Sequence, residues 1–190
     1  DTNSLAKLGA RSVIGVDIAE DLISIARDLA RRLGTAATFV TADVLALPAD
    51  LDSGADLVYT GKGAVHWMFD IKTWGRMVAR LLRPGGMFLL YDFHPMMWLF
   101  RADGTVMRPT GVSYFAPIIS YRDWPEHHVG DLDIPAEKVA EERLRPWPPS
   151  AVIQSLLDAG LELCAFGEYP DTGGAPAAAD SSSKICSCTG

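Results

Sequence analysis

The feature that most constrains this chain is a short apolar run that ends in an acid. Residues 12–17 read Ser-Val-Ile-Gly-Val-Asp, and a helical pattern begins within three residues of Asp17. A β-branched run bounded in this way predicts a buried parallel strand. Open α/β sheets bind ligands at the carboxyl ends of their strands. Asp17 is therefore either a carboxylate for the ribose of a nucleoside-containing cofactor or a simple cap for the next helix.

Helices and strands alternate on both sides of this run. A short helix is expected over residues 2–8, and two further β-rich runs follow at residues 37–43 and 55–60. Strand, helix, strand predicts a βαβ unit with a right-handed crossover, which brings Asp17, Asp43 and Thr60-Gly61 to one sheet edge. The helix between the first two strands spans residues 20–33, with acids in its first turn, arginines in its last and Gly34 after it. Its apolar residues share one face: Leu22, Ile25, Ala26, Leu29 and Leu33.

The alternation continues and then breaks. Asp70 is placed to cap a helix over residues 71–82, and the Arg83-Pro84-Gly85-Gly86 turn leads into a strand over residues 87–91. Residues 94–147 lose this rhythm, carry an Asp103-Gly104 hairpin signal and read as a substrate-side insertion. A helix over 150–159 and a strand over 161–166 complete a single expected domain of residues 1–170. Residues 171–190 form a low-complexity tail rich in Gly, Ala, Ser and Pro, which is expected to lack fixed structure.

Composition narrows the class of protein. The chain has 190 residues, of which 48% are hydrophobic, so it is long enough for one α/β domain with a full core. Its net charge of −7 argues against a nucleic-acid partner. Its three cysteines make neither a disulfide framework nor a zinc site, so no metal is expected and a reducing, cytoplasmic setting fits best. Apolar runs fall short of the ~20 residues that span a bilayer, so no membrane partner is expected.

Four pieces in order resemble a known family. They are the strand end at Gly15-Val16-Asp17-Ile18, the Thr41-Ala42-Asp43-Val44 segment, the run at residues 55–60, and the Leu82-Arg83-Pro84-Gly85-Gly86 turn before a strand. In this order and spacing the chain is similar to class I S-adenosylmethionine-dependent methyltransferases. The resemblance implies an α/β Rossmann-like sheet that is mostly parallel, with helices on both faces. It also implies transfer of a methyl group from S-adenosyl-L-methionine to an acceptor.

The resemblance assigns roles to particular residues. It implies that Asp17 holds the ribose hydroxyls, that Ile18 packs on the adenine, and that Asp43 with the Val44 amide reads the adenine edge. Asp1 and Thr2 resemble the last residues of the family's glycine-rich motif, near the methionine end of the cofactor, and Thr60-Gly61 would lie beside the sulfonium. Relative to the family, the chain lacks the first strand and its glycine-rich loop, which predicts a truncated chain. The tail after Tyr169 also does not read as the family's last, antiparallel strand.

The sequence indicates less clearly which residues bind the methyl acceptor and remove its proton. A general base is needed only where the acceptor must lose a proton, and His94 and His66 are the candidates because imidazole titrates near neutral pH. His127-His128 in the insertion is a weaker candidate. An apolar cover over a small, partly hydrophobic acceptor would be formed by aromatic residues of the insertion: Trp98, Phe100, Tyr114, Phe115 and Trp124.

Two other functions remain open from the sequence. An acid after a strand of a βαβ unit also reads ribose in NAD(P)-dependent oxidoreductases. Asp43 and the turn at residues 83–86 favour the methyltransferase over that alternative. A chain without its central strand could instead be a non-catalytic fragment that binds no cofactor.

Overall fold

The computed structural model describes residues 1–103, 105–121, 140–169 and 186–188. The chain divides into two compact units, Asp1–Asp52 and Ser53–Gly190. No helix in these described stretches combines the length and apolar character that crossing a membrane requires.

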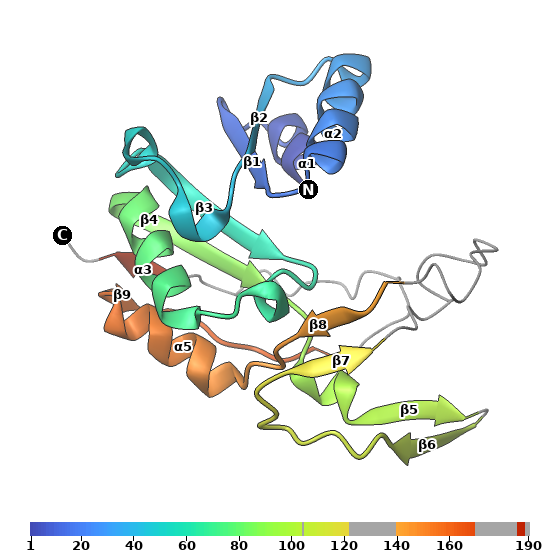
Figure 1. Cartoon of the computed structure of the whole chain (residues 1–190). Coiled ribbons are helices and arrows are strands. Elements are labelled where there is room, and N and C mark those ends of the chain that lie inside the picture. Colours follow the sequence, from blue (N-terminus) through green and yellow to red (C-terminus); the bar gives the residue numbers. More distant parts are fainter. Residues whose placement is uncertain (104, 122–139, 170–185, 189–190) are drawn as a thin grey trace. The chain divides into compact units, whose positions relative to one another are not determined.

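The first unit is the predicted βαβ arrangement with one short helix before it (Figure 1). In chain order, its elements are α1 (Thr2–Lys7), β1 (Val13–Asp17), α2 (Glu20–Leu33) and β2 (Ala37–Thr41). Strands β1 and β2 are parallel, with Val13 opposite Ala37 and Asp17 opposite Thr41. Gly34 ends α2 in the left-handed conformation, at φ 63°, which confirms the predicted glycine cap. Two short 3-10 turns, η1 (Val44–Ala46) and η2 (Ala49–Leu51), follow.

The core of this unit is small and centres on one aromatic ring. Ile23 and Ala30 of α2 pack with Phe39 of β2, and all three are buried. Gly15 of β1 lies under the same ring, because a β-carbon at this position would lie 2.9 Å from a Phe39 ring carbon and 2.7 Å from the Thr2 hydroxyl oxygen. A glycine therefore lets α1 and the ring both approach β1.

The apolar face that the sequence predicts for α2 is only partly buried. Four of its side chains remain 40% to 63% exposed. The Phe39 ring of β2 packs instead against Ile23 and Ala30, which lie on the neighbouring face of the helix. The exposed members are Leu22, Ile25, Leu29 and Leu33.

The second unit is built on a four-stranded sheet in the order β3-β4-β10-β9. Its strands are β3 (Ala55–Gly61), β4 (Leu82–Tyr91), β9 (Leu161–Glu162) and β10 (Cys186–Cys188). Strands β3 and β4 are parallel, with Leu57 opposite Met87 and Gly61 opposite Tyr91. The residues predicted as a turn at 83–86 already belong to β4, and the register shifts between Ala55 and Leu57.

Strand β10 corrects the expectation that the tail contains no strand. Its residues pair antiparallel with both β4 and β9, with Ser187 opposite Met87 on one side and Glu162 on the other. Pairing of this kind uses backbone groups, so a three-residue segment with little apolar pattern gives no sequence signal for it. The predicted strand over 161–166 shortens to β9, the part that β10 pairs with.

Two helices pack on this sheet in the manner the sequence predicts. Asp70 caps α3 (Ile71–Leu81) by accepting a hydrogen bond from the Thr73 amide at 3.0 Å. Trp74 of α3 is buried with its ring 5.5 Å from that of Phe88, edge to face. The second helix, α5 (Pro149–Asp158), packs directly against α3.

The insertion contains two antiparallel pairs. The predicted hairpin strands are present as β5 (Phe100–Asp103) and β6 (Val106–Pro109), which pair antiparallel. Strands β7 (Ile119–Tyr121) and β8 (Glu142–Leu144) form the second pair, and Leu144 is fully buried. The 3-10 turns η3 (Val65–Trp67) and η4 (Pro95–Trp98) follow β3 and β4.

The contact between α3 and α5 can be tested with Gly75→Ala. For this change, helix propensity predicts a higher free energy of unfolding and packing predicts a lower one. A β-carbon on Gly75 would lie 2.4 Å from the Ser155 carbonyl oxygen, a backbone atom that cannot move aside. Gly75→Ala should lower the free energy of unfolding by about 1–3 kcal/mol, although alanine favours an open helix position by up to ~1 kcal/mol. Urea unfolding measures the change, with Lys72→Ala on the exposed face of α3 as the control. A stabilised Gly75→Ala variant would contradict this packing.

Candidate functional site

Two carboxylates mark the carboxyl edge of the first unit. Asp17 accepts a hydrogen bond from the Ala19 amide at 2.8 Å, and Asp43 accepts one from the Leu45 amide at 2.8 Å. In each case one carboxylate oxygen is used, and the other makes no hydrogen bond to a residue that the structure describes. The two strand ends are tied together, since the Ala42 amide donates to the Asp17 carbonyl at 3.0 Å. Both acids therefore shape the local backbone and still offer an oxygen to a ligand.

The neighbours of these acids differ in exposure. Ile18 is 73% exposed, so it is not the core residue that its apolar character alone suggests. Val44 is partly buried in η1. Asp1 and Thr2 lie at the start of α1, where they line a cavity of about 310 Å³ together with residues of α1, α2 and β2. Thr2 packs over Gly15 rather than extending away from the sheet.

In the second unit, the chain turns sharply after β3. Thr60 and Gly61 end the strand, and the Lys62 amide donates to the Tyr91 carbonyl at 2.8 Å. Lys62 and Gly63 both have positive φ, at 59° and 90°. A left-handed conformation at two successive residues directs the following loop back over the end of β4.

Asp92 holds this loop in place. Its Oδ1 accepts from the Gly63 amide at 2.6 Å and the Phe93 amide at 2.7 Å, and its Oδ2 accepts from the Val65 amide at 2.9 Å. A carboxylate that accepts several backbone N–H bonds is an effective anchor for irregular backbone. No role for Asp92 was predicted, although it shares with Asp17 and Asp43 the position of an acid at the end of a strand.

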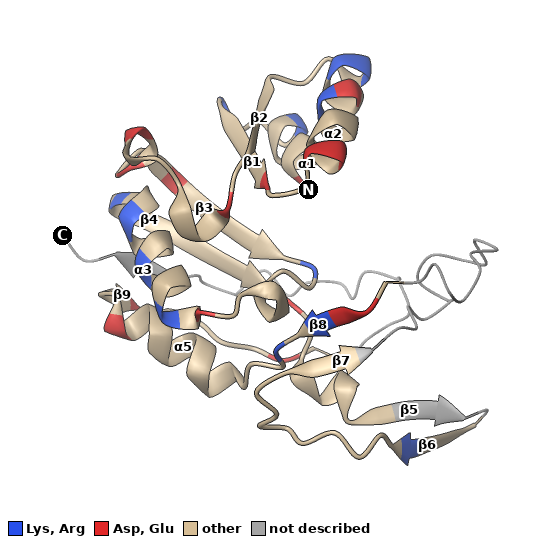
Figure 2. Cartoon of the chain, viewed as in Figure 1, with Lys and Arg blue, Asp and Glu red and all other residues tan. Residues whose placement is uncertain are grey.

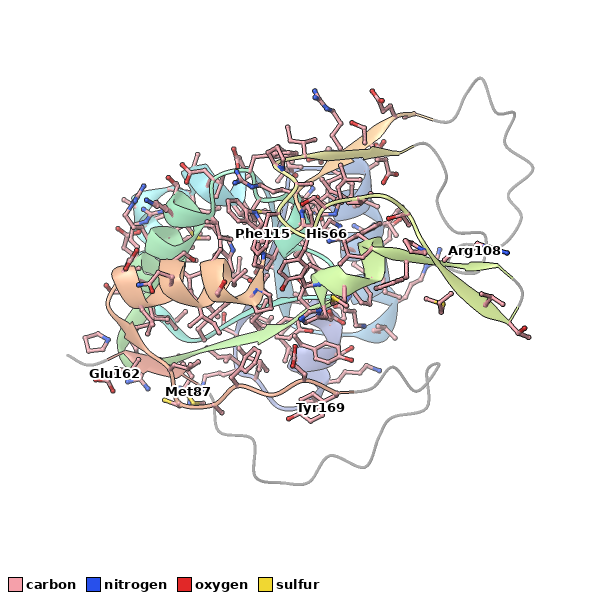
Figure 3. The ribbon with its side chains drawn as sticks, turned by 90° about the horizontal axis from the view of Figure 1, so that it is seen from below. His66, Met87, Arg108, Phe115, Glu162 and Tyr169 are labelled. Atoms are coloured by element: carbon pink, nitrogen blue, oxygen red, sulfur yellow. The ribbon has the colours of Figure 1, made fainter. Side chains whose placement is uncertain are left out.

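His66 sits on the loop that Asp92 anchors, and the insertion holds the loop from the other side. The Arg145 amide donates to the His66 carbonyl at 2.8 Å, and the Trp147 indole N–H donates to the Met68 carbonyl at 2.6 Å. Figure 3 shows the labelled His66 among neighbouring side chains. Its ring lies 5.1 Å from the Trp67 ring and 5.7 Å from the Trp98 ring.

The environment of His66 favours the neutral imidazole. Burial lowers the pKa of His66, and the charges of Asp92 and Glu142 oppose this shift without reversing it. Within the described residues, no side chain or amide hydrogen-bonds to its ring nitrogens. A neutral imidazole with an unused lone pair is suited to accept a proton.

His94 is placed differently. Its Nδ1 accepts from the Met96 amide at 3.2 Å, its Nε2 lies 2.9 Å from a Glu168 carboxylate oxygen, and its ring stacks on Tyr114 at 6.4 Å. Both ring nitrogens are thus engaged, so His94 ties η4 to the segment after β9. The geometry favours His66 over His94 as a base.

The aromatic cover over the acceptor stays a prediction, and four of its five residues lie in the described part of the chain. Tyr114 and Phe115 meet edge to face at 5.0 Å, and Phe115 is 76% exposed. Trp98 faces His66, and Phe100 of β5 is 39% exposed. Trp124 and His127-His128 lie outside the described residues.

The predicted site residues therefore fall into two groups. Asp17 and Asp43 lie at neighbouring strand ends in the first unit, and Gly61 and His66 lie in the second, at the end of β3 and on the loop after it. That the two groups form one site stays a prediction. No set of three or more His, Cys, Asp or Glu side chains in the described stretches is arranged to hold a metal ion.

Comparisons with known proteins fit this arrangement. Residues 1–86 match the model of the family described as "Methyltransferase domain". The fold is similar to an S-adenosylmethionine-dependent methyltransferase from Clostridium acetobutylicum, with a TM-score of 0.61, 14% identity, and coverage of 95% of this chain and 76% of that one. It is also similar to one from Mesorhizobium loti, with a TM-score of 0.56, 21% identity, and coverage of 83% and 66%.

A third similar structure is the PH0226 protein from Pyrococcus horikoshii, with a TM-score of 0.61, 20% identity, and coverage of 88% of this chain and 70% of that one. No curated protein sequence matches the chain. The chain is therefore similar to methyltransferases in the match over residues 1–86 and in its fold.

The environment of His66 yields a pH prediction. Because burial lowers the pKa of His66, its NMR titration midpoint should lie below the ordinary value of 6.5. The unfolded chain then binds the proton more readily, so this group's contribution to stability is lost as pH falls from about 6.5 through the folded pKa. The His66→Gln variant assigns the resonance and should flatten this part of the stability profile. A midpoint above 6.5 would show that His66 is not buried as described.

Proposed function

We propose that the chain transfers the methyl group of S-adenosyl-L-methionine to a small acceptor, with the cofactor's nucleoside held at the edge formed by β1 and β2. The observation that carries this proposal is the pair of strand-end acids. Asp17 and Asp43 each use one oxygen locally and leave the other for a ligand. The exposed Ile18 side chain beside them offers an apolar surface for a planar base. A hydroxyl-binding carboxylate next to an apolar surface fits a nucleoside.

In this proposal, Asp17 accepts hydrogen bonds from the two ribose hydroxyls. Asp43 and the Val44 amide read the adenine edge, and Asp1 and Thr2 lie toward the methionine end. Thr60 and Gly61 border the reacting centre, where a residue without a side chain permits close approach. S-Adenosyl-L-methionine supplies an electrophilic methyl group whose leaving group is a neutral thioether.

The chemistry asked of the protein is mainly positioning. An acceptor lone pair forms the new bond to the methyl carbon as the carbon–sulfur bond breaks and its electron pair returns to sulfur. Holding the two reactants in line is worth up to about 7–11 kcal/mol of the barrier. Where the acceptor carries a proton, His66 takes it, since its imidazole is neutral and its nitrogens are not engaged by described residues. His94 instead supports η4 through its two hydrogen-bonded nitrogens.

The surroundings of His66 also bear on the acceptor. Trp67 and Trp98 contact its ring, and the half-exposed Phe93 lies with His66 beside Gly63. Aromatic surfaces of this kind suit a small, partly hydrophobic acceptor. The family match does not favour the oxidoreductase or the non-catalytic fragment.

Calorimetric titration of the whole chain tests the cofactor. S-Adenosylhomocysteine should bind and NADH should give no heat. Asp17→Asn should weaken binding at least about tenfold, which corresponds to ~1.4 kcal/mol, because a carboxylate oxygen facing the ribose is lost. Asp50→Asn, which changes an exposed acid in η2, serves as the control. Binding of NADH instead, or unchanged binding by Asp17→Asn, would sink the assignment.

The base is tested separately with labelled methyl groups. Pools of small phenols and amines are incubated with the enzyme and methyl-labelled S-adenosyl-L-methionine, and transfer is followed as pH is varied. His66→Gln should lose about 10²–10⁴-fold of the rate for an acceptor that must be deprotonated, and His94→Gln should retain most of it. Greater loss in His94→Gln would assign the base to His94.

A further inference from the structure

Asp92 holds the backbone that leads into His66 with both of its carboxylate oxygens. Its Oδ1 accepts from the Gly63 amide at 2.6 Å, and its Oδ2 accepts from the Val65 amide at 2.9 Å. Gly63 and Val65 are buried, so loss of an acceptor would leave a buried N–H group without a partner. An asparagine offers only one acceptor oxygen, and its NH₂ group would face the second amide donor to donor. The two amides therefore require a carboxylate.

The imidazole of His66 folds back onto the same stretch of backbone. A β-carbon on Gly63 would lie 2.9 Å from His66 Cε1, so the ring occupies the space that a side chain at this position would need. Phe93, whose amide also donates to Asp92, has its ring 3.3 Å from the same β-carbon position. The Asp92 carboxylate and the His66 ring thus both lie against Gly63.

The charges that face His66 from the described residues are both negative. Asp92 and Glu142 each act to raise the pKa of His66, against the lowering effect of burial. Figure 2 shows acidic residues at the start of β8, and this strand packs against η3, the turn that contains His66. The rings of Trp67 and Trp98, which contact the imidazole, carry no charge. A positive charge formed on this imidazole is therefore stabilised by its surroundings.

We propose that Asp92 is a positioning residue for the reaction and that it acts through His66. This inference rests on the proposed function, in which His66 removes the acceptor's proton. In that step the proton passes from the acceptor to an imidazole nitrogen, and the electron pair of the broken bond stays on the acceptor atom that binds the methyl group. Asp92 fixes the backbone that carries the imidazole and places a negative charge beside the imidazolium that forms.

NMR titration of His66 tests the placement of this charge without any turnover. In Asp92→Asn the His66 midpoint should fall by about 0.5–1 on the pH scale, because a facing negative charge is lost. Trp147→Phe is the matched control. The Trp147 indole N–H donates to the Met68 carbonyl at 2.6 Å, so this change loosens the other end of the same loop and removes no charge. Its His66 midpoint should equal that of the parent chain.

Two results of this titration would overturn the proposal. One is an unchanged or higher His66 midpoint in Asp92→Asn, which would show that the carboxylate does not face the imidazole. The other is an equal fall in Trp147→Phe, which would show that the midpoint follows the looseness of the loop and not the charge of Asp92.

Hydrogen exchange on the parent chain tests the anchoring independently of any variant. The Gly63 and Val65 amides should exchange at least about a hundredfold more slowly than in an unstructured peptide, because each is hydrogen-bonded to Asp92. Exchange at the rate of an unstructured peptide would overturn the proposal, and this measurement decides the matter even where Asp92→Asn does not fold.

Methyl transfer tests the link to the reaction. With a phenol that the enzyme methylates, Asp92→Asn should lower kcat at least about tenfold with little change in KM, because proton removal is impaired. The acidic limb of its pH–rate profile should move to lower pH together with the His66 midpoint. A change in KM alone, or an unmoved limb, would overturn the proposal. Absence of transfer by the parent chain would instead sink the proposed function, while the titration and exchange results would still decide whether Asp92 positions His66.

Discussion

The structure depends on how parallel strands end. Where a strand stops, the next residues leave the sheet with backbone N–H groups that need acceptors, and in this chain aspartates supply them. Asp17 and Asp43 each accept a hydrogen bond from the backbone amide two residues further along the chain. Asp92 accepts from a backbone amide in the loop after the neighbouring strand, β3. The same need that shapes the backbone thus gathers carboxylates at strand ends, the edge at which open α/β sheets bind ligands.

Much of the fold follows from local pattern. The βαβ unit, the Asp70 cap and the hairpin at Asp103-Gly104 were all predicted, since the signal for each of their elements lies within a short stretch of sequence. For α2 the pattern predicts a helix correctly, but not which side is covered. Burial depends on what the neighbouring strands present, and here one ring of β2 decides it.

The site was predictable where chemistry and strand ends coincide, and less so where tertiary contacts decide roles. His66 and His94 cannot be ranked from sequence, because the contacts that separate them come from Arg145, Trp147 and Glu168, far along the chain. For Asp92, the position at the end of a strand is clear from the sequence, but the three backbone amides that donate to its carboxylate are not. In both cases the role of a residue depends on the residues that contact it in the folded chain, and residue type alone does not predict it.

The position of β10 between β4 and β9 bears on how this unit is made. Residues 186–188 pair with strands that precede them by about 100 residues in one case and about 25 in the other. During synthesis, β4 and β9 would each present an unpaired edge until that segment emerges. An exposed edge is a template for pairing with other chains. Until residues 186–188 are made, the edge of β4 that they pair with is therefore open to pairing with other chains.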